Sequence, residues 1–207
     1  MALEFLLGFA DGYLAATNNY FVYQISPSSS KFMFLLWDID HTLGSTAYIK
    51  LSQMVSGDWH NFASIVSKRP LMKFIHVPEY AKRFDQLIYE LNDKLMNLDV
   101  IGQRIDDTVA MLQEDVAWDK SCPRVNEPDI TSDNEIAAMQ SISVIQEKMD
   151  ADFKTYKEFT TQRMIHEDVG FIQAVNGPTS YKYTLMGLKE FIKIKHQNVA
   201  DHYGSKQ

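Results

Sequence analysis

Acidic and amide side chains of the kind that bind divalent cations gather near the start of this 207-residue chain. Asp11 follows an apolar stretch, Asn18 and Asn19 precede an aromatic segment, and Asp38 and Asp40 follow a second apolar segment. Phosphoryl transfer needs a carboxylate that orients the attacking hydroxyl, and hard oxygen ligands for Mg²⁺ beside the phosphates. The pattern therefore indicates a metal-dependent phosphotransferase site.

Each of these residues also has a purely structural interpretation. Asp11 fits a helix end, Asn19 fits a turn before a strand, and His41 beside Asp40 fits an ordinary polar turn. Two carboxylates directly after an apolar strand are costly to desolvate unless they serve a ligand. The pair at Asp38 and Asp40 therefore favours the functional interpretation of the whole set.

The segments around these residues predict a β-hairpin. Residues 20–25 are aromatic and β-branched, residues 26–30 read Ser-Pro-Ser-Ser-Ser, and residues 31–37 are apolar almost throughout. The second strand is therefore expected to be buried on both faces. Because a hairpin brings its two ends together, we expect Asp11, Asn19 and Asp38 to converge on one ion.

The remaining pattern predicts an α+β fold, in which a short hairpin carrying the acidic site is followed by a mainly helical body. Residues 45–69 have no clear period. The other expected elements are a buried helix over 1–9, a loop over 12–18, helices over 78–95 and 98–116, a loop over 119–133, helical periods over 135–172, a break at 176–178 and a last helix over about 184–200.

Composition excludes some classes of partner. The net charge of -7 argues against nucleic acid, whose phosphate backbone requires a basic surface. Cys122 is the single cysteine, so no disulfide can form within the chain. The apolar runs are far shorter than the ~20 residues of a membrane span, and the first residues lack the basic segment and cleavage site of a signal peptide. We expect neither feature in this chain.

Three motifs in this order resemble the CotH kinase family, which comprises spore coat protein H-like proteins and fungal invasin-like members. The motifs are Ala-Asp-Gly-Tyr at 10–13, Asn-Tyr-Phe-Val-Tyr at 19–23 and Phe-Leu-Leu-Trp-Asp-Ile-Asp-His-Thr-Leu-Gly at 34–44. Weaker similarities follow at 70–72, 77–80, 116–120 and 187–192. The resemblance is specific in the first 44 residues and weaker beyond them.

The resemblance implies an atypical protein kinase that uses ATP and Mg²⁺, or a similar divalent cation, to phosphorylate coat or surface proteins. It places Asp11 as the catalytic aspartate, and Asn19 and Asp38 as the residues that bind the cofactor and its metal. Asp40 is implied as a further metal ligand or as a carboxylate that organises the turn. The resemblance also implies a fold like the C-terminal lobe of a kinase, and a location in the spore coat or at the cell surface.

The sequence departs from the family pattern at three points. Ala10 replaces the usual Trp, Leu43 replaces the closing Phe, and only ten residues precede Asp11. A kinase needs a strand-rich lobe with a loop and a Lys for the phosphates, and 1–207 offers no such segment. We therefore expect 1–207 to be the C-terminal part of the domain and to be inactive, or nearly so, by itself. The alternative is a non-catalytic, invasin-like surface-binding protein.

A second alternative is a haloacid-dehalogenase-like phosphatase, because residues 34–43 also resemble the first motif of that family. Asp38 would then form an aspartyl-phosphate, and Asp40 would act as general acid and base. That family needs a doubly wound parallel sheet, whereas the later part of this chain has helical periods. The pattern downstream therefore favours the kinase-like interpretation.

Overall fold

The computed structural model describes residues 1–45, 49, 51–62, 69–122, 170–177 and 186–204. In this part of the chain, a two-stranded antiparallel sheet accompanies a mainly helical body, which confirms the predicted α+β class. The elements are α1 (Ala2–Leu7), α2 (Tyr13–Ala16), β1 (Tyr20–Gln24), β2 (Phe32–Leu36), α3 (Leu51–Met54), the 3₁₀ helices η1 (Trp59–Asn61) and η3 (Pro70–His76), α4 (Pro78–Leu95), α5 (Leu98–Ser121), α9 (Phe171–Asn176) and α10 (Leu188–Gly204).

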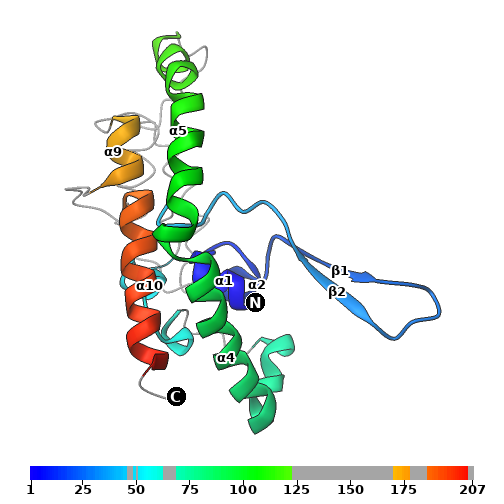
Figure 1. Cartoon of the computed structure of the whole chain (residues 1–207). Coiled ribbons are helices and arrows are strands. Elements are labelled where there is room, and N and C mark those ends of the chain that lie inside the picture. Colours follow the sequence, from blue (N-terminus) through cyan, green and yellow to red (C-terminus); the bar gives the residue numbers. More distant parts are fainter. Residues whose placement is uncertain (46–48, 50, 63–68, 123–169, 178–185, 205–207) are drawn as a thin grey trace, which may run out of the picture.

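The helical body is arranged around α4, α5 and α10. Pro78 occupies the first turn of α4, where its missing N–H has no intrahelical partner to lose. The side chain of Asn97 caps α5 by accepting a hydrogen bond of 2.9 Å from the Asp99 N–H. Figure 1 shows α4 and α5 following one another in a column, with α10 beside them and α1 near the centre.

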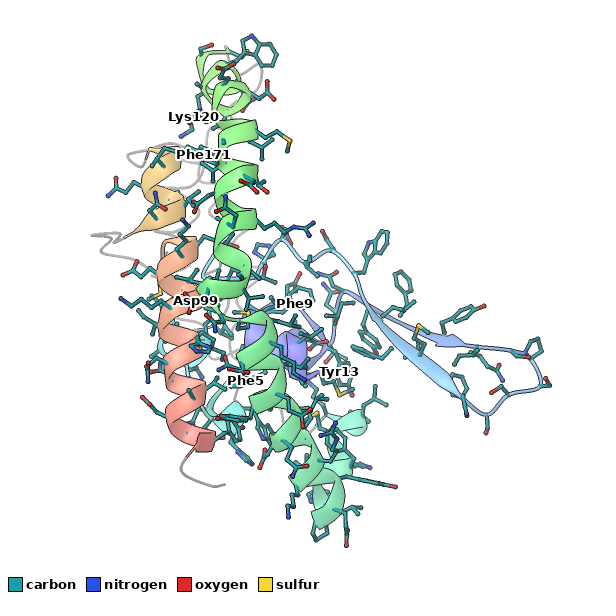
Figure 2. The ribbon with its side chains drawn as sticks, viewed as in Figure 1. Phe5, Phe9, Tyr13, Asp99, Lys120 and Phe171 are labelled. Atoms are coloured by element: carbon teal, nitrogen blue, oxygen red, sulfur yellow. The ribbon has the colours of Figure 1, made fainter. Side chains whose placement is uncertain are left out.

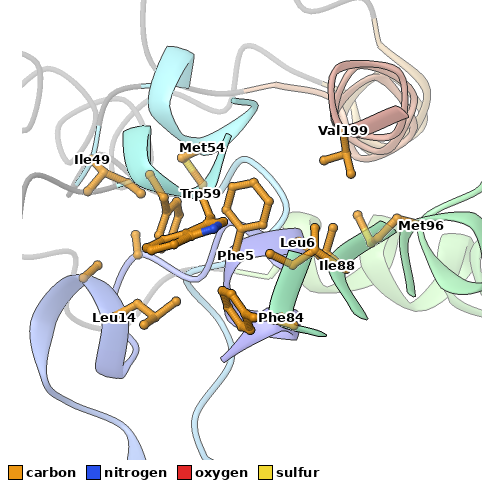
Figure 3. Packing of buried hydrophobic residues seen from close by; sticks show 14 of the residues in the cluster. Phe5, Leu6, Leu14, Ile49, Met54, Trp59, Phe84, Ile88, Met96 and Val199 are labelled. Atoms are coloured by element: carbon orange, nitrogen blue, oxygen red, sulfur yellow. The ribbon is translucent and has the colours of Figure 1, made fainter. Parts of the chain in front are cut away.

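The hydrophobic core forms where α1 meets α4, α10 and the segment around η1. Phe5 and Leu6 of α1 are fully buried, and they lie among Trp59, Ile88 and Val199 from these other elements (Figure 3). The ring of Phe5 packs edge-on against Phe62, with the centroids 6.0 Å apart. The helix that leads into Asp11 is therefore anchored in the core.

The hairpin leaves this core as an extended arm (Figure 1). Its register pairs Tyr20 with Leu36 and Val22 with Phe34. At its base, the rings of Tyr20 and Phe34 stack with centroids 5.3 Å apart, and both pack edge-on against the buried Tyr13. These three rings join the hairpin to the helical body.

The expectation that the second strand is buried on both faces is wrong. Its residues are exposed or half-buried, and Phe32 retains 60% of its accessible surface. An apolar strand is covered on both faces when other layers pack over its sheet. In the described part of the chain the sheet has two strands, and no layer covers the outer part of the hairpin. Figure 2 shows its side chains standing clear of the helices.

Several predicted boundaries also need correction. The expected loop over 12–18 contains the short helix α2, and α5 continues to Ser121 into the expected loop over 119–133. The last helix begins and ends four residues later than expected, at Leu188 and Gly204. The expected helical periods over 135–169 lie outside the described residues.

Candidate functional site

The carboxylate of Asp11 is held by the side-chain amides of two asparagines. Asn19 donates to Oδ2 at 2.9 Å, and Asn18 donates to both carboxylate oxygens at 3.3 and 3.2 Å. Asp11 and Asn19 are half-buried, whereas Asn18 is exposed. The structure therefore brings together Asp11, Asn18 and Asn19, which the sequence singles out, and fixes the carboxylate with donors that carry no charge.

The position of Asp11 is set by the end of α1. Gly8 closes this helix in the left-handed conformation, with φ of 63°, which costs glycine nothing. Glu4, fully buried in α1, accepts a hydrogen bond of 2.8 Å from the Leu14 N–H at the start of α2. Burial raises the pKa of Glu4, and the hydrogen bond from Leu14 opposes that shift. The turn that carries Asp11 is thus bracketed by α1 and α2.

The base of the hairpin brings Asp38 to the same region. The Trp37 N–H donates to the Asn19 carbonyl at 2.9 Å, which continues the strand pairing by one residue pair. Asn19 and Asp38 both adopt the left-handed conformation, with φ of 50° and 51°. Asn and Asp tolerate this conformation better than other non-glycine residues do. The two polar side chains therefore flank the point where the hairpin begins and ends.

The loop after β2 is bonded to the segment that carries Asp11. The Ala10 N–H donates to the His41 carbonyl at 3.0 Å, and the Leu43 N–H donates to the Leu7 carbonyl at 2.7 Å. Within the loop, the Ser45 hydroxyl donates to the Asp40 carbonyl at 2.7 Å. Asp40 lies 3.5 Å from the ring of His41 and is half exposed. Asp40 is therefore held beside the site by its backbone neighbours, and its carboxylate lies between the His41 ring and solvent.

Asp11 and Asn19 are in direct contact, whereas Asp38 and Asp40 are exposed neighbours in the adjoining loop. Among the described residues, no group of three or more His, Cys, Asp or Glu side chains is placed to hold a metal ion. A Mg²⁺ site does not require such a group, because this ion keeps several waters and is bound by one or two carboxylates together with substrate phosphates.

The donor set fits an ion of this kind. The amide nitrogen of Asn19 is committed to Asp11, which leaves its carbonyl oxygen available as a ligand. Asp38 adds a carboxylate at the base of the hairpin, just after its second strand. The available ligands are therefore hard oxygens. Asn19 and Asp38 would hold the cation, and Asp40 would support it.

Two residues outside the motifs shape the site without carrying a sequence signal. Glu4 reads as one charge in an apolar helix, and Arg69 lies 58 residues after Asp11 in a segment without a clear period. Arg69 donates hydrogen bonds to the Leu14 and Ala15 carbonyls and to the Thr17 hydroxyl. Asn18 adjoins Asn19 in the sequence, and its side-chain amide also donates hydrogen bonds to the Asp11 carboxylate, a contact that the sequence alone does not indicate.

The phosphatase alternative finds no support in the fold. It requires parallel strands whose carboxyl ends share one edge of a sheet. In the described ranges the strands are β1 and β2, which are antiparallel and adjacent in sequence. Asp38 and Asp40 follow a hairpin strand, and the part of the chain that the structure describes offers no neighbouring parallel strand end for the remaining residues of a phosphatase site.

Comparison with known proteins identifies the family. The sequence model described as CotH kinase protein matches residues 1–173. This range includes α1, α2, the hairpin, the loop that carries Asp38 and Asp40, α4 and α5. The chain belongs to the CotH kinase family. No curated protein and no solved structure matches it, so the likeness to a kinase lobe stays a prediction. No helix in the described ranges is long and apolar enough to span a membrane.

Proposed function

We propose that this chain is the metal-binding part of a CotH-family phosphotransferase, which transfers phosphate from ATP to hydroxyl groups of coat or surface proteins. The contact between Asp11 and Asn19 at the base of the hairpin carries the proposal. It joins a carboxylate that can accept a hydroxyl proton to an amide whose oxygen is not used in that contact and can bind a cation. The family match over residues 1–173 supports the same chemistry.

Each residue has a distinct role in this proposal. Asp11 orients the substrate hydroxyl and accepts its proton, while Asn18 and Asn19 keep the carboxylate in place. Asn19, just before the first strand, and Asp38, just after the second, hold the cation at the base of the hairpin. Asp40 supports them from the following loop. The bound Mg²⁺ supplies charge neutralisation to the phosphates of ATP. A spore-coat or cell-surface location follows from the family and belongs to the same proposal.

Binding of Mn²⁺, a paramagnetic substitute for Mg²⁺, tests the cation site. We expect Asp38→Asn to weaken Mn²⁺ binding by at least tenfold, because it removes a charged ligand while keeping the left-handed turn at position 38. Asp93→Asn, which neutralises an exposed carboxylate on α4, is the matched control and is expected to leave the affinity within about twofold. Electron paramagnetic resonance titration of the 207-residue chain measures free Mn²⁺ directly.

The same chain is expected to show little or no ATP turnover by itself. Turnover that Asp11→Ala abolishes would contradict this expectation and establish that the 207 residues suffice for catalysis. Equal Mn²⁺ affinities for the wild type, Asp38→Asn and Asp93→Asn would contradict the proposed cation site. These two measurements therefore separate the chemistry of Asp11 from the binding of the metal.

A second candidate function is that of a non-catalytic binding protein, and the exposed face of the hairpin favours it. The register places six large side chains on this face, each 41–63% exposed: Phe21, Tyr23, Ile25, Met33, Leu35 and Trp37. Together they expose roughly several hundred Å² of apolar surface, which on a monomer usually marks an interaction site. The hairpin carries one charged residue, Lys31, so a partner would be recognised by apolar contact.

Two sets of variants distinguish the candidates. In a cosedimentation assay with isolated spore coats, the binding-protein function predicts at least a tenfold loss for Phe21→Ser with Trp37→Ser, and no loss for Asp11→Asn with Asp38→Asn. Phe32→Ser, on the opposite face and 60% exposed, is the matched control. Binding of Mn²⁺ and ATP that fails in the aspartate variants but survives in the hairpin variants would favour the phosphotransferase.

A further inference from the structure

Along the chain, the four-residue helix α2 lies between Asp11 and Asn19, whose side chains are in contact. Asp11 stands two residues before this helix, and Asn18 and Asn19 follow its C-cap residue Thr17. A helix this short has no stability of its own, since a single turn fixes more dihedral angles than its hydrogen bonds repay. Contacts from outside α2 must therefore fix the distance between the Asp11 carboxylate and the Asn19 amide.

Those contacts come from two charged residues at opposite ends of α2. At the N-terminal end, the buried carboxylate of Glu4 accepts from the Leu14 N–H at 2.8 Å. At the C-terminal end, Arg69 donates from Nε to the Leu14 carbonyl at 3.2 Å and from its terminal nitrogens to the Ala15 carbonyl and the Thr17 hydroxyl. A negative group at the helix start and a positive group at its end both suit the unsatisfied backbone groups there.

Thr17, whose hydroxyl accepts a hydrogen bond from Arg69, has a strained backbone conformation. Thr17 has φ of 58°, a left-handed conformation that a β-branched residue rarely adopts. A strained residue stays in place only when its surroundings over-determine it. The bond from Arg69 to the Thr17 hydroxyl supplies that constraint one residue before Asn18.

A further hydrogen bond ties the same segment to α2. The Leu71 N–H, two residues after Arg69, donates to the Tyr13 hydroxyl at 2.9 Å. Tyr13 in turn packs against Tyr20 and Phe34 at the base of the hairpin. The start of η3 is therefore connected both to α2 and to the strand that follows Asn19.

We propose that Glu4 and Arg69 form a clamp on α2 that positions Asp11 against Asn19. Neither residue is assigned contact with ATP, metal or substrate, so both are positioning residues. The clamp rests on the proposed function for its catalytic meaning, although the Asp11–Asn19 contact that it sets is a property of the fold. Loss of the clamp lets Thr17 leave the left-handed conformation, and Asn18 and Asn19 then move away from the carboxylate.

Arg69→Met tests the clamp, because it keeps the length of the side chain and removes its donors. We expect Mn²⁺ affinity to fall about 10- to 100-fold, the range seen when residues that support metal ligands are replaced. Arg83→Met, which removes an exposed ion pair with Glu90, is the matched control and is expected to stay within about twofold. Arg69→Lys, which retains one charge and loses the fork, is expected to lie between the two and serves if Arg69→Met does not fold.

A rescue experiment separates positioning from general stabilisation. Glycine adopts the left-handed conformation without strain. In Thr17→Gly, residue 17 therefore keeps this conformation without the hydrogen bond from Arg69. We expect Arg69→Met to lose far less Mn²⁺ affinity in the Thr17→Gly background than in the wild type. A merely destabilising effect of Arg69→Met would persist unchanged in that background and would overturn the clamp.

A second readout does not depend on the metal. In the wild type, the hydrogen-bonded side-chain amide of Asn19 is expected to exchange slowly with solvent, and Arg69→Met is expected to speed this exchange at least tenfold in nuclear magnetic resonance spectra. An unchanged exchange rate in folded Arg69→Met would overturn the clamp. Absence of Mn²⁺ binding in the wild type would instead overturn the proposed function, and the Asn19 exchange rate would still decide on the clamp.

Discussion

Gly57→Ala is expected to lower the free energy of unfolding by at least about 3 kcal/mol and to loosen α10. Gly57 lies between α3 and η1, where a Cβ atom would overlap the backbone carbonyl oxygen of Asn198 in α10. A flexible side chain could move aside, but a carbonyl inside a helix cannot. The whole helix would therefore have to shift away from the segment that contains Gly57.

Such a shift breaks the hydrogen bonds around Gly57. The Asn198 amide donates to the Val55 carbonyl at 2.7 Å, and Lys195 donates to the Met54 and Ser56 carbonyls at 2.9 and 2.8 Å. These hydrogen bonds and the buried side chains of α10 together hold this helix in place. Urea unfolding and hydrogen exchange of the α10 amides measure the two expected effects, and a folded variant with unchanged stability would contradict the predicted overlap.

Gly102→Ala is the matched control. Gly102 lies inside α5, where the nearest atom to an added Cβ is 3.9 Å away, an ordinary contact. Alanine is favoured over glycine in a helix interior by about 1 kcal/mol, so this variant is expected to be slightly more stable. Two glycine-to-alanine changes in one chain would then have opposite signs, which isolates the steric cause at Gly57.

The result bears on how far the functional unit extends. The family match ends at residue 173, whereas α10 runs from Leu188 to Gly204. Phe191 and Lys195 of α10 are nonetheless fully buried, and the Lys195 ammonium position lies 3.4 Å from the centre of the Phe5 ring in α1. Since α1 leads directly into Asp11, the helix beyond the matched residues supports the element that presents the site.

The local signals in the sequence account for the elements that are stable by their own pattern. Helices α4 and α5 show apolar residues at helical spacing and have Pro78 and Asn97 at their starts, so their existence and N-terminal bounds were predictable. The hairpin was predictable from two apolar runs separated by a Ser- and Pro-rich turn. The motifs that resemble the CotH kinase family identified it correctly.

The remaining features depend on partners that are distant in sequence. The short helix α2 looked like a loop because Glu4 and Arg69 hold it rather than its own residues. Asp11, Asn19 and Asp38 were predicted to converge on one ion, and the hydrogen bond that joins Asp11 to Asn19 could not be read from the sequence. The exposure of β2 could not be read from an apolar run, since burial is decided by what packs over the hairpin.

Burial of Lys195 is a further feature that the sequence concealed. The last helix contains Lys189, Lys193 and Lys195, and Lys195 alone of the three is fully buried. Its side-chain nitrogen donates hydrogen bonds to two carbonyl oxygens, which matches the two donors of a neutral amine. Burial lowers the pKa of Lys195 well below the ordinary lysine value of 10.5.

This lowered pKa predicts how stability depends on pH. Between the folded pKa and 10.5, the unfolded chain binds a proton at Lys195 that the folded chain does not bind. The free energy of unfolding must therefore rise with pH across this window, by up to about 1.4 kcal/mol per unit from this one group. Below the folded pKa both states are protonated, and the contribution of Lys195 becomes independent of pH.

Lys195→Met isolates this contribution, because methionine fills a similar volume and does not titrate. We expect the stability of the wild type to rise relative to Lys195→Met by roughly 3 kcal/mol over two pH units within the window. Absolute stability at one pH is less informative, since the variant also leaves two carbonyls without their donor. Urea unfolding between pH 7 and about 9 gives the difference in slope, and stays about one unit below the pKa of unfolded tyrosines, near 10.

Lys193→Met is the matched control, since Lys193 is exposed on the same helix two residues earlier. Its pH profile is expected to run parallel to that of the wild type. Parallel profiles for the wild type and Lys195→Met would show that Lys195 keeps its proton in the folded state. Its ammonium group would then make a cation–π contact with the Phe5 ring. A steeper wild-type profile would show instead that Lys195 is a neutral amine where α10 packs against α1. Acidification alone would then weaken the packing of α10 on the helix that leads into Asp11.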